Sequence, residues 1–231
     1  MNSPTTLSTA KLRIKEAKVC IFDFDGTIAN LDGLNVEGFQ KMFMSRFGIT
    51  FTEKDFMEYV SGKGSTDGIK EYLAAYEIFE YEIDELSSIF NNKKRQLLTN
   101  RMGSVIYLLP GIEKFLEYVE ESKRPMVVAT SSRYEYAIRV FLHFGIDKYF
   151  KEIIDRDSIV KGKPAPDIFL KAVEATGFAI DECVAFEDSQ YGLMSAKAAG
   201  LYTVGILNKG WNDEFVYDLA DVVVEDYKEL I

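Results

Sequence analysis

DFDGT at residues 23–27 directly follows the apolar run VCIF at 19–22. The apolar run predicts a buried strand, and the Gly-Thr pair predicts a turn where that strand ends. Because alternate residues of an extended chain point to the same side, the side chains of Asp23 and Asp25 should face one way. Two such carboxylates can hold a hard cation and leave one oxygen free for nucleophilic attack. Taken alone, the pentapeptide also fits a solvated acidic turn, so its meaning depends on the rest of the chain.

The composition is that of a globular protein. Of the 231 residues, 47% are hydrophobic and 13% are aromatic, which excludes a disordered chain. This length suits one large domain, or a main domain with a smaller insert. The formal net charge of −10 argues against nucleic-acid binding, because a phosphate backbone is bound by an excess of lysine and arginine. The basic stretch at 93–101 is expected to be the solvated face of a helix.

The N-terminal stretch 1–18 is polar where a signal peptide would be apolar, and no later run is long enough to span a membrane. We therefore expect a cytoplasmic protein with no membrane partner. Cys20 and Cys183 lie in apolar, strand-like runs and are expected to be core residues, with no disulfide or zinc site. His143, the only histidine, lies in a helical pattern, where a packed or surface role is expected.

The order of elements predicts a parallel sheet with a helical insert. Residues 34–101 are helix-like almost throughout, with Phe39, Met42 and Phe43 recurring at helical spacing. From Pro110 onward helices alternate with strands; the helices are expected at 111–122, 134–144, 165–176 and 190–199, and the strands at 126–130, 152–154, 183–187, 202–207 and 221–225. Helices that end on glycine and lead into short apolar strands are typical of the crossovers of a parallel sheet. The sequence predicts an α/β, Rossmann-like core domain at 1–30 and 105–231, and a helical-bundle domain inserted at 31–104.

Polar residues follow the carboxyl end of each main strand, the edge at which open parallel sheets bind ligands. They are Thr130, Ser131 and Ser132 after the second strand, GKPAPD at 162–167 after the third, and Glu187, Asp188 and Ser189 at the fourth. Serine and aspartate are common helix caps, so Asp188 and Ser189 alone would need no other explanation. Capping does not explain why acids, hydroxyls and a proline-flanked lysine all lie at one edge, and this combination indicates a functional site.

Four of these segments resemble the four motifs of the haloacid dehalogenase superfamily, in the usual order: DFDGT at 23–27, VVATSS at 127–132, GKPAPD at 162–167 and FEDSQYG at 186–192. The resemblance covers 19–30 and about 105–225. The helical insert after the first motif resembles the four-helix cap of the subgroup that contains β-phosphoglucomutase and many small-metabolite phosphatases. The second acid, Asp25, argues against a true haloalkanoate dehalogenase, because that branch lacks it.

The resemblance implies phosphoryl transfer through an aspartyl-phosphate. Asp23 would be the nucleophile, and Asp25 would be the general acid for the leaving group and then the base for water. The implied cofactor is Mg²⁺, held by Asp23, the backbone carbonyl of Asp25 and Asp188. Glu187 would lie in or just outside the coordination shell.

The same resemblance implies how the phosphoryl group is held. Lys163 would neutralise the charge on the nucleophile and on the transferring group. Thr130 and backbone amides near Gly26 and Ser131 would donate hydrogen bonds to the phosphate oxygens, with Ser132 beside them. A lone lysine is more often a surface charge, but its position between Gly162 and Pro164 in this motif favours the catalytic role of Lys163.

The leaving group should be recognised by the insert, closing as a lid over the core. The candidate residues there are Asn35, Lys63, Ser65 and Lys93. Lys63 lies between glycines in SGKGST at 61–66, which would allow its side chain to reach the core, although a solvated loop lysine fits equally well.

Two departures from the mutase pattern favour hydrolysis. β-Phosphoglucomutases carry a cap histidine where this chain has Asn35, and a cap-loop arginine where the loop 61–66 offers only Lys63. An asparagine cannot shuttle a proton. We therefore expect a monomeric phosphatase acting on a small phosphate ester such as a sugar phosphate. The alternatives are a sugar phosphomutase of the β-phosphoglucomutase type and a non-catalytic regulatory or binding protein, and the latter would predict a damaged motif, which is not seen.

Overall fold

The computed structural model describes residues 7–61, 63–207 and 214–231. These residues form two compact units, one of residues 7–29 and 108–231 and the other of residues 30–107. The sequence placed the insert at 31–104. The expectation drawn from the N-terminal stretch falls partly on residues 1–6, and the loop 61–66 includes Gly62; both lie outside the described residues.

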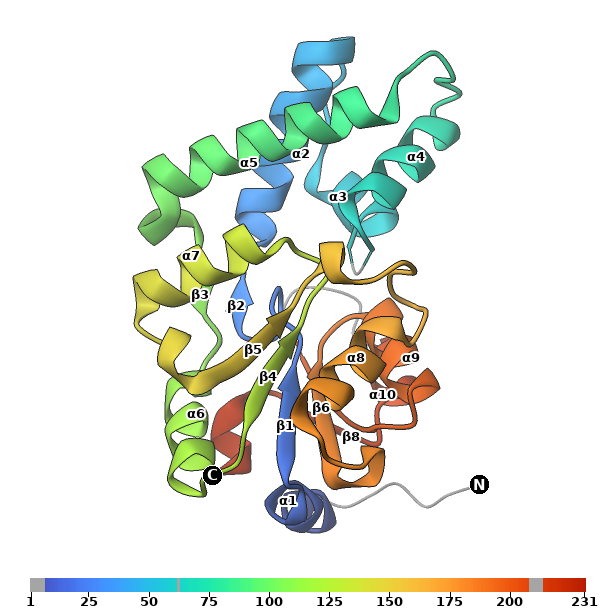
Figure 1. Cartoon of the computed structure of the whole chain (residues 1–231). Helices are drawn as coiled ribbons and strands as arrows, with labels where there is room; N and C mark the ends of the chain where they lie inside the picture. Colours follow the sequence, from blue (N-terminus) through green and yellow to red (C-terminus); the bar gives the residue numbers. More distant parts are fainter. Residues whose placement is uncertain (1–6, 62, 208–213) are drawn as a thin grey trace. The chain divides into compact units, whose positions relative to one another are not determined.

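The first unit is built on a parallel sheet with the strand order β5-β4-β1-β6-β7-β8 (Figure 1). The strands are β1 Val19–Phe22, β4 Met126–Ala129, β5 Phe150–Ile154, β6 Cys183–Glu187, β7 Tyr202–Ile206 and β8 Val222–Val224. Every residue of β1, β4 and β6 is buried, as expected for strands that are covered on both faces. The α/β parallel-sheet fold predicted from the sequence is confirmed.

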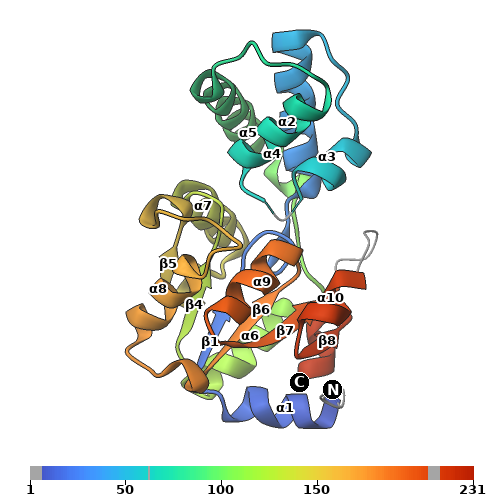
Figure 2. The same cartoon turned by 90° about the vertical axis from the view of Figure 1, so that its right-hand side faces the viewer.

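Helices cover both faces of this sheet (Figure 2). They are α6 Ile112–Glu121, α7 Tyr134–Phe144, α8 Asp167–Thr176, α9 Gln190–Ala198 and α10 Glu214–Leu219, with short 3₁₀ turns at Asp147–Tyr149, Arg156–Ser158, Ile180–Glu182 and Tyr227–Leu230. The helix α1 Leu7–Glu16 lies instead at the end of the sheet where β1 begins (Figure 1). The predicted helices and strands are observed and differ only at their ends, whereas α1 and α10 were not predicted. Gly145 and Gly177 end α7 and α8 with positive φ angles of 68° and 76°, which glycine adopts without steric cost.

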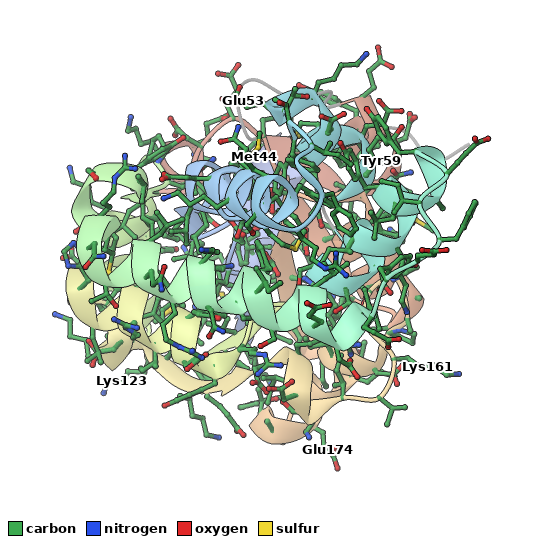
Figure 3. The ribbon with its side chains drawn as sticks, turned by 90° about the horizontal axis from the view of Figure 1, so that it is seen from above. Met44, Glu53, Tyr59, Lys123, Lys161 and Glu174 are labelled. Carbon is green, nitrogen blue, oxygen red and sulfur yellow. The ribbon has the colours of Figure 1, made fainter. Side chains whose placement is uncertain are left out.

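The two faces of the central strands have different cores because side chains alternate along a strand. Ile21 and Ala185 pack with Phe169 of α8 on one face. On the other face Phe22 stacks on Phe186, with ring centroids 4.6 Å apart, and both lie against Phe115 of α6. Charged side chains such as Lys123 and Glu174 project outward (Figure 3).

The described residues of the second unit form four helices: α2 Asp32–Phe47, α3 Glu53–Tyr59, α4 Ser65–Ala75 and α5 Ile83–Val105. Its core is rich in aromatic rings; Phe39 of α2 stacks on Phe90 of α5 with centroids 4.2 Å apart. Gly38 leaves room for this ring, since a Cβ at that position would lie 3.0 Å from Phe90. Thr52 and Asp55 form a reciprocal capping box at the start of α3.

The short strands β2 Ala29–Asn30 and β3 Tyr107–Leu108 form a separate two-stranded sheet at the points where the chain passes between the units. Both cysteines are buried and free, as expected, and His143 is exposed on α7. Of the helices within the described ranges, none is both long and apolar enough to cross a membrane.

Candidate active site

The candidate residues of the first unit lie at the carboxyl ends of neighbouring strands. Phe22, the last residue of β1, is in register with Val128 of β4 and Phe186 of β6, so the three strands end level. Asp23 continues this alignment, because its N–H donates to the carbonyl of Phe186 at 2.9 Å. Thr130 follows β4 and donates its N–H to Ile154 at 2.9 Å. The parallel register therefore brings Asp23, Thr130 and Glu187 to one edge.

Lys163 joins two of these strand ends. Its Nζ lies 2.5 Å from Asp23 Oδ1 and 2.5 Å from Glu187 Oε1. The lysine side chain is 3% exposed, and the two carboxylate side chains are 8% and 0% exposed. A buried charge needs such partners to offset its loss of hydration. This ion-paired triad of Asp23, Lys163 and Glu187 fixes the orientation of the Asp23 carboxylate.

Both carboxylate oxygens of Glu187 accept hydrogen bonds from other residues of the protein. While Oε1 accepts from Lys163, Oε2 accepts from the N–H and hydroxyl of Ser189 at 2.7 and 3.0 Å. Gly192 provides the space, since a Cβ there would lie 1.6 Å from Glu187 Oε1. Glu187 therefore holds Lys163, and its place in or just outside a metal's coordination shell stays a prediction. Ser189 also caps α9 by accepting from the N–H of Gly192 at 3.1 Å, so the helix-cap interpretation applies to it.

Asp188 is held against the loop that carries Asp23. The Thr27 hydroxyl donates to Asp188 Oδ1 at 2.9 Å. Gly26 has a φ of +89°, and a Cβ on it would lie 1.9 Å from Asp188 Oδ2. The Gly26 N–H donates to the carbonyl of Ala29 at 2.8 Å, and the phosphate contact expected of backbone amides near Gly26 stays a prediction. The glycine allows the close approach of Asp188.

Tyr227 contacts the loop that follows Asp23, and the sequence analysis did not predict this contact. Its hydroxyl donates to the carbonyl of Thr27 at 3.1 Å, although the two residues are 200 positions apart. The ring is fully buried and lies 5.2 Å from the ring of Phe115 and 6.0 Å from that of Phe186. A continuous chain of hydrogen bonds therefore runs from Tyr227 through Thr27 to Asp188. No motif at Tyr227 signals this role.

The hydroxyl cluster after β4 offers donors for an anion one strand away from Asp23. Thr130 is 1% exposed, and its Oγ1 accepts from the N–H of Ser132 at 3.0 Å. A hydroxyl that accepts one bond can still donate its proton to another group. Within the described ranges the Ser131 N–H makes no hydrogen bond. Thr130 and Ser131 therefore fit the expected phosphate contacts, whereas the Ser132 amide is already used.

The acidic groups at this edge outnumber the positive charge beside them. Burial raises the pKa of Asp23 to about 7; Lys163 opposes the rise, and Glu187 and Asp25 add to it. Burial, then Glu187 and Asp23, hold the pKa of Asp188 well above its usual value. Burial alone would lower the pKa of Lys163, but Asp23 and Glu187 outweigh it and raise that pKa. The site therefore favours an additional cation.

A magnesium ion fits this donor set only if backbone, water or substrate oxygens complete it. No three His, Cys, Asp or Glu side chains among the described residues form a group that could hold a metal ion. Mg²⁺, however, is commonly bound by one or two carboxylates together with waters and substrate phosphate. The charge excess around Asp23 and Asp188 suits such a site, with the backbone carbonyl of Asp25 as the third candidate ligand.

The pKa of Asp23 predicts how metal-free protein responds to pH. Between pH 3.8 and about 7, folded Asp23 keeps a proton that the unfolded chain releases. We therefore expect wild-type stability, relative to that of Asp23→Asn, to be greatest below this range and to fall as the pH rises through it. Thermal unfolding in chelator across this range measures the difference. Saturating Mg²⁺ should reduce the fall, and a rise with pH in chelator would contradict the prediction.

The remaining candidates belong to the second unit. Asn35 is buried in α2, and Ser65 is the first residue of α4. Lys63 forms an ion pair with Glu71 of α4. Lys93 is half-buried in α5, next to the buried Lys94, whose Nζ lies 6.0 Å from the centroid of the Phe90 ring. These contacts describe the second unit alone, so a role for Asn35, Lys63 or Lys93 in substrate binding stays a prediction.

The family model described as Haloacid dehalogenase-like hydrolase matches residues 20–206. This chain therefore belongs to the haloacid dehalogenase-like hydrolases, which confirms the resemblance of the four motifs. The match includes the strand ends that carry Asp23, Lys163 and Asp188, together with the inserted helical unit.

Several relatives carry the names of phosphatases or mutases. The chain is 28% identical to a phosphorylated carbohydrates phosphatase of Thermotoga maritima, over 78% of this chain and 81% of that protein. It is 27% identical to a β-phosphoglucomutase of Mycobacterium tuberculosis, over 94% of this chain and 92% of that protein. It is also 28% identical to a bifunctional riboflavin kinase/FMN phosphatase of Arabidopsis thaliana, of which it spans 57%.

Solved structures share the fold. CbbY from Rhodobacter sphaeroides, in a complex with phosphate, superposes with a TM-score of 0.80 at 23% identity, covering 93% of this chain and 96% of that one. At this level of identity the similarity establishes the architecture only.

Proposed function

We propose that this protein is a magnesium-dependent phosphatase that hydrolyses a small phosphorylated metabolite, such as a sugar phosphate, through an aspartyl-phosphate on Asp23. The observation that carries the proposal is the buried triad of Asp23, Lys163 and Glu187, with Asp188 fixed against the same loop. Phosphorylated carbohydrates are the substrates named for one relative, which supports this substrate class.

In the first step an Asp23 oxygen attacks phosphorus, and the bond from phosphorus to the ester oxygen breaks. Asp25, half-buried two residues further on, gives its proton to that departing oxygen. In the second step Asp25 takes a proton from water, the water oxygen attacks phosphorus, and the bond to Asp23 breaks to release phosphate. Lys163 holds the Asp23 carboxylate in place, and Thr130 with the Ser131 N–H would donate to the phosphate oxygens. Mg²⁺, when bound, supplies positive charge that lets carboxylate and phosphate approach each other.

A phosphomutase is the second candidate, because one relative of similar length is a β-phosphoglucomutase. Asn35 argues against it, since this buried amide cannot shuttle a proton to a second sugar hydroxyl. A non-catalytic binding protein is disfavoured because the ion pairs and hydrogen bonds of the core site are all formed. For the second unit, residues 30–107, we propose the role of a specificity cap.

One experiment separates these functions. Wild-type protein is given a panel of phosphorylated sugars, polyols and nucleotides, with Mg²⁺ or with chelator, and free phosphate and isomerised product are measured in the same samples. The phosphatase proposal expects Mg²⁺-dependent release of phosphate from at least one ester. Isomerised sugar phosphate with little free phosphate would overturn it in favour of a mutase. A complete lack of turnover would favour the binding protein.

The metal assignment predicts that Asp188→Asn raises the dissociation constant for Mg²⁺ by at least about tenfold. The proposed site has few protein ligands, and this variant loses one of them. The isosteric amide can still accept from Thr27, so the fold should persist. Calorimetric titration of Mg²⁺ measures the constant without turnover, and Asp181→Asn, at an exposed aspartate, is the matched control. Unchanged affinity in Asp188→Asn would mean that another acid is the ligand.

A further inference from the structure

Arg156 lies between two loops of the candidate active site. It begins the 3₁₀ turn that directly follows β5, and its backbone N–H donates to the carbonyl of Ser132 at 3.2 Å. Its guanidinium lies against Gly162, since a Cβ on that glycine would be 3.7 Å from both Arg156 Cζ and Nη1. One loop carries the hydroxyl cluster of Thr130, and the other carries Lys163. The backbone of Arg156 therefore contacts the first of these loops, and its positive charge lies against the second, next to Lys163 in the sequence.

The guanidinium of Arg156 has no acidic partner in the part of the chain that the structure describes. Both neighbouring aspartates are engaged elsewhere. Asp155 accepts from the Tyr134 N–H at 3.0 Å and from the Ser158 hydroxyl at 2.6 Å. Asp157 lies 3.9 Å from Nε of Arg133. Arg156 is half-buried, so its guanidinium has lost part of its hydration without gaining a carboxylate counter-ion, and a bound anion would compensate for that loss.

We propose that Arg156 binds a second anionic group on the non-reacting part of the substrate. Lys163 cannot serve this purpose, because its ammonium is held between Asp23 and Glu187. A guanidinium stays charged, and its forked N–H groups match a carboxylate or a second phosphate. The inference rests on the proposed phosphatase function and narrows its substrate class: small phosphate monoesters that carry a further anionic group.

The test compares the terminal phosphate esters of glycerate and of glycerol, which have the same chain length and differ in one carboxylate. Each is titrated as a competitive inhibitor of aryl phosphate hydrolysis, so neither needs to be turned over. We expect wild-type enzyme to bind the glycerate ester more tightly. Arg156→Gln should weaken binding of the glycerate ester, relative to the glycerol ester, by at least about tenfold, as for the loss of a hydrogen bond to a charged group.

Lys161→Gln is the matched control, because it removes a positive charge from the adjacent loop that carries Lys163. Lys161 is exposed, and its side chain points outward at the edge of the molecule (Figure 3). The ratio of the two inhibition constants should stay at the wild-type value in this variant. Three results would overturn the inference: no preference in wild-type enzyme, equal weakening of both esters by Arg156→Gln, or an equal change of the ratio in Lys161→Gln. Failure of the proposed function would look different, as wild-type enzyme would not hydrolyse the aryl phosphate at all.

Discussion

Asp23→Asn should lower turnover of any phosphate ester by at least about a thousandfold while the core domain still folds. The amide keeps the shape of the carboxylate and can still accept from Lys163 Nζ, but it is no longer an anionic nucleophile. Burial already raises the pKa of Asp23 to about 7, so the folded protein readily accepts a neutral group at this position. Initial rates on an aryl phosphate, with Mg²⁺ saturating for each variant, give the size of the loss.

Asp218→Asn makes the same chemical change at an exposed aspartate of α10 and should retain wild-type rates. Circular dichroism and thermal unfolding establish that Asp23→Asn is folded, so that lost activity reflects lost chemistry. Residual activity within about tenfold of wild type would refute the assignment of Asp23, because losing the attacking group of a covalent mechanism costs far more than that.

The fold could be predicted from sequence because its strands are buried on both faces. Such strands appear as continuous apolar runs, and VCIF, MVVA and CVAF each became a fully buried strand. The glycines after α7, α8 and α9 marked where three of the crossovers return to the sheet. The proximity of Lys163 to Asp23 was implied by the family resemblance, and it agrees with a parallel topology that brings the carboxyl ends of the strands to one edge. Local pattern and topology were sufficient for the fold, whereas this contact needed the resemblance of the four motifs.

Contacts between distant segments could not be predicted in this way. Tyr227 reaches the carbonyl of Thr27 from the other end of the chain, and no spacing in the sequence records that hydrogen bond. The space that Gly26 leaves for Asp188 was not predicted, because its positive φ and the close approach of Asp188 appear only once the loop is folded. Arg156 likewise lacks an acidic partner because the side chains of Asp155 and Asp157 contact other residues, which only the folded structure shows. Sequence patterns report residue types, whereas these features depend on side-chain directions.

Lys163→Met should abolish activity and also destabilise the protein by about 3–5 kcal/mol near neutral pH in chelator. Methionine fills a similar volume, but it leaves Asp23 and Glu187 as buried carboxylates with no cation between them. The destabilisation should shrink as the pH falls, because protonation removes the uncompensated charges. Denaturant unfolding at two pH values measures both effects. Lys161→Met, an exposed change in the same loop, should match wild type in stability and activity.

The double variant Lys163→Met/Glu187→Gln distinguishes a charge effect from a packing effect. If Lys163→Met loses stability because two buried carboxylates are left unpaired, neutralising Glu187 should restore part of that stability. The second change removes one of the two charges, and the glutamine amide can still accept from Ser189. Activity should stay abolished, because Asp23 still lacks the ammonium that orients its carboxylate and offsets phosphate charge. If the double variant were no more stable than Lys163→Met, the lysine would be needed for packing, and the electrostatic account of this triad would be wrong.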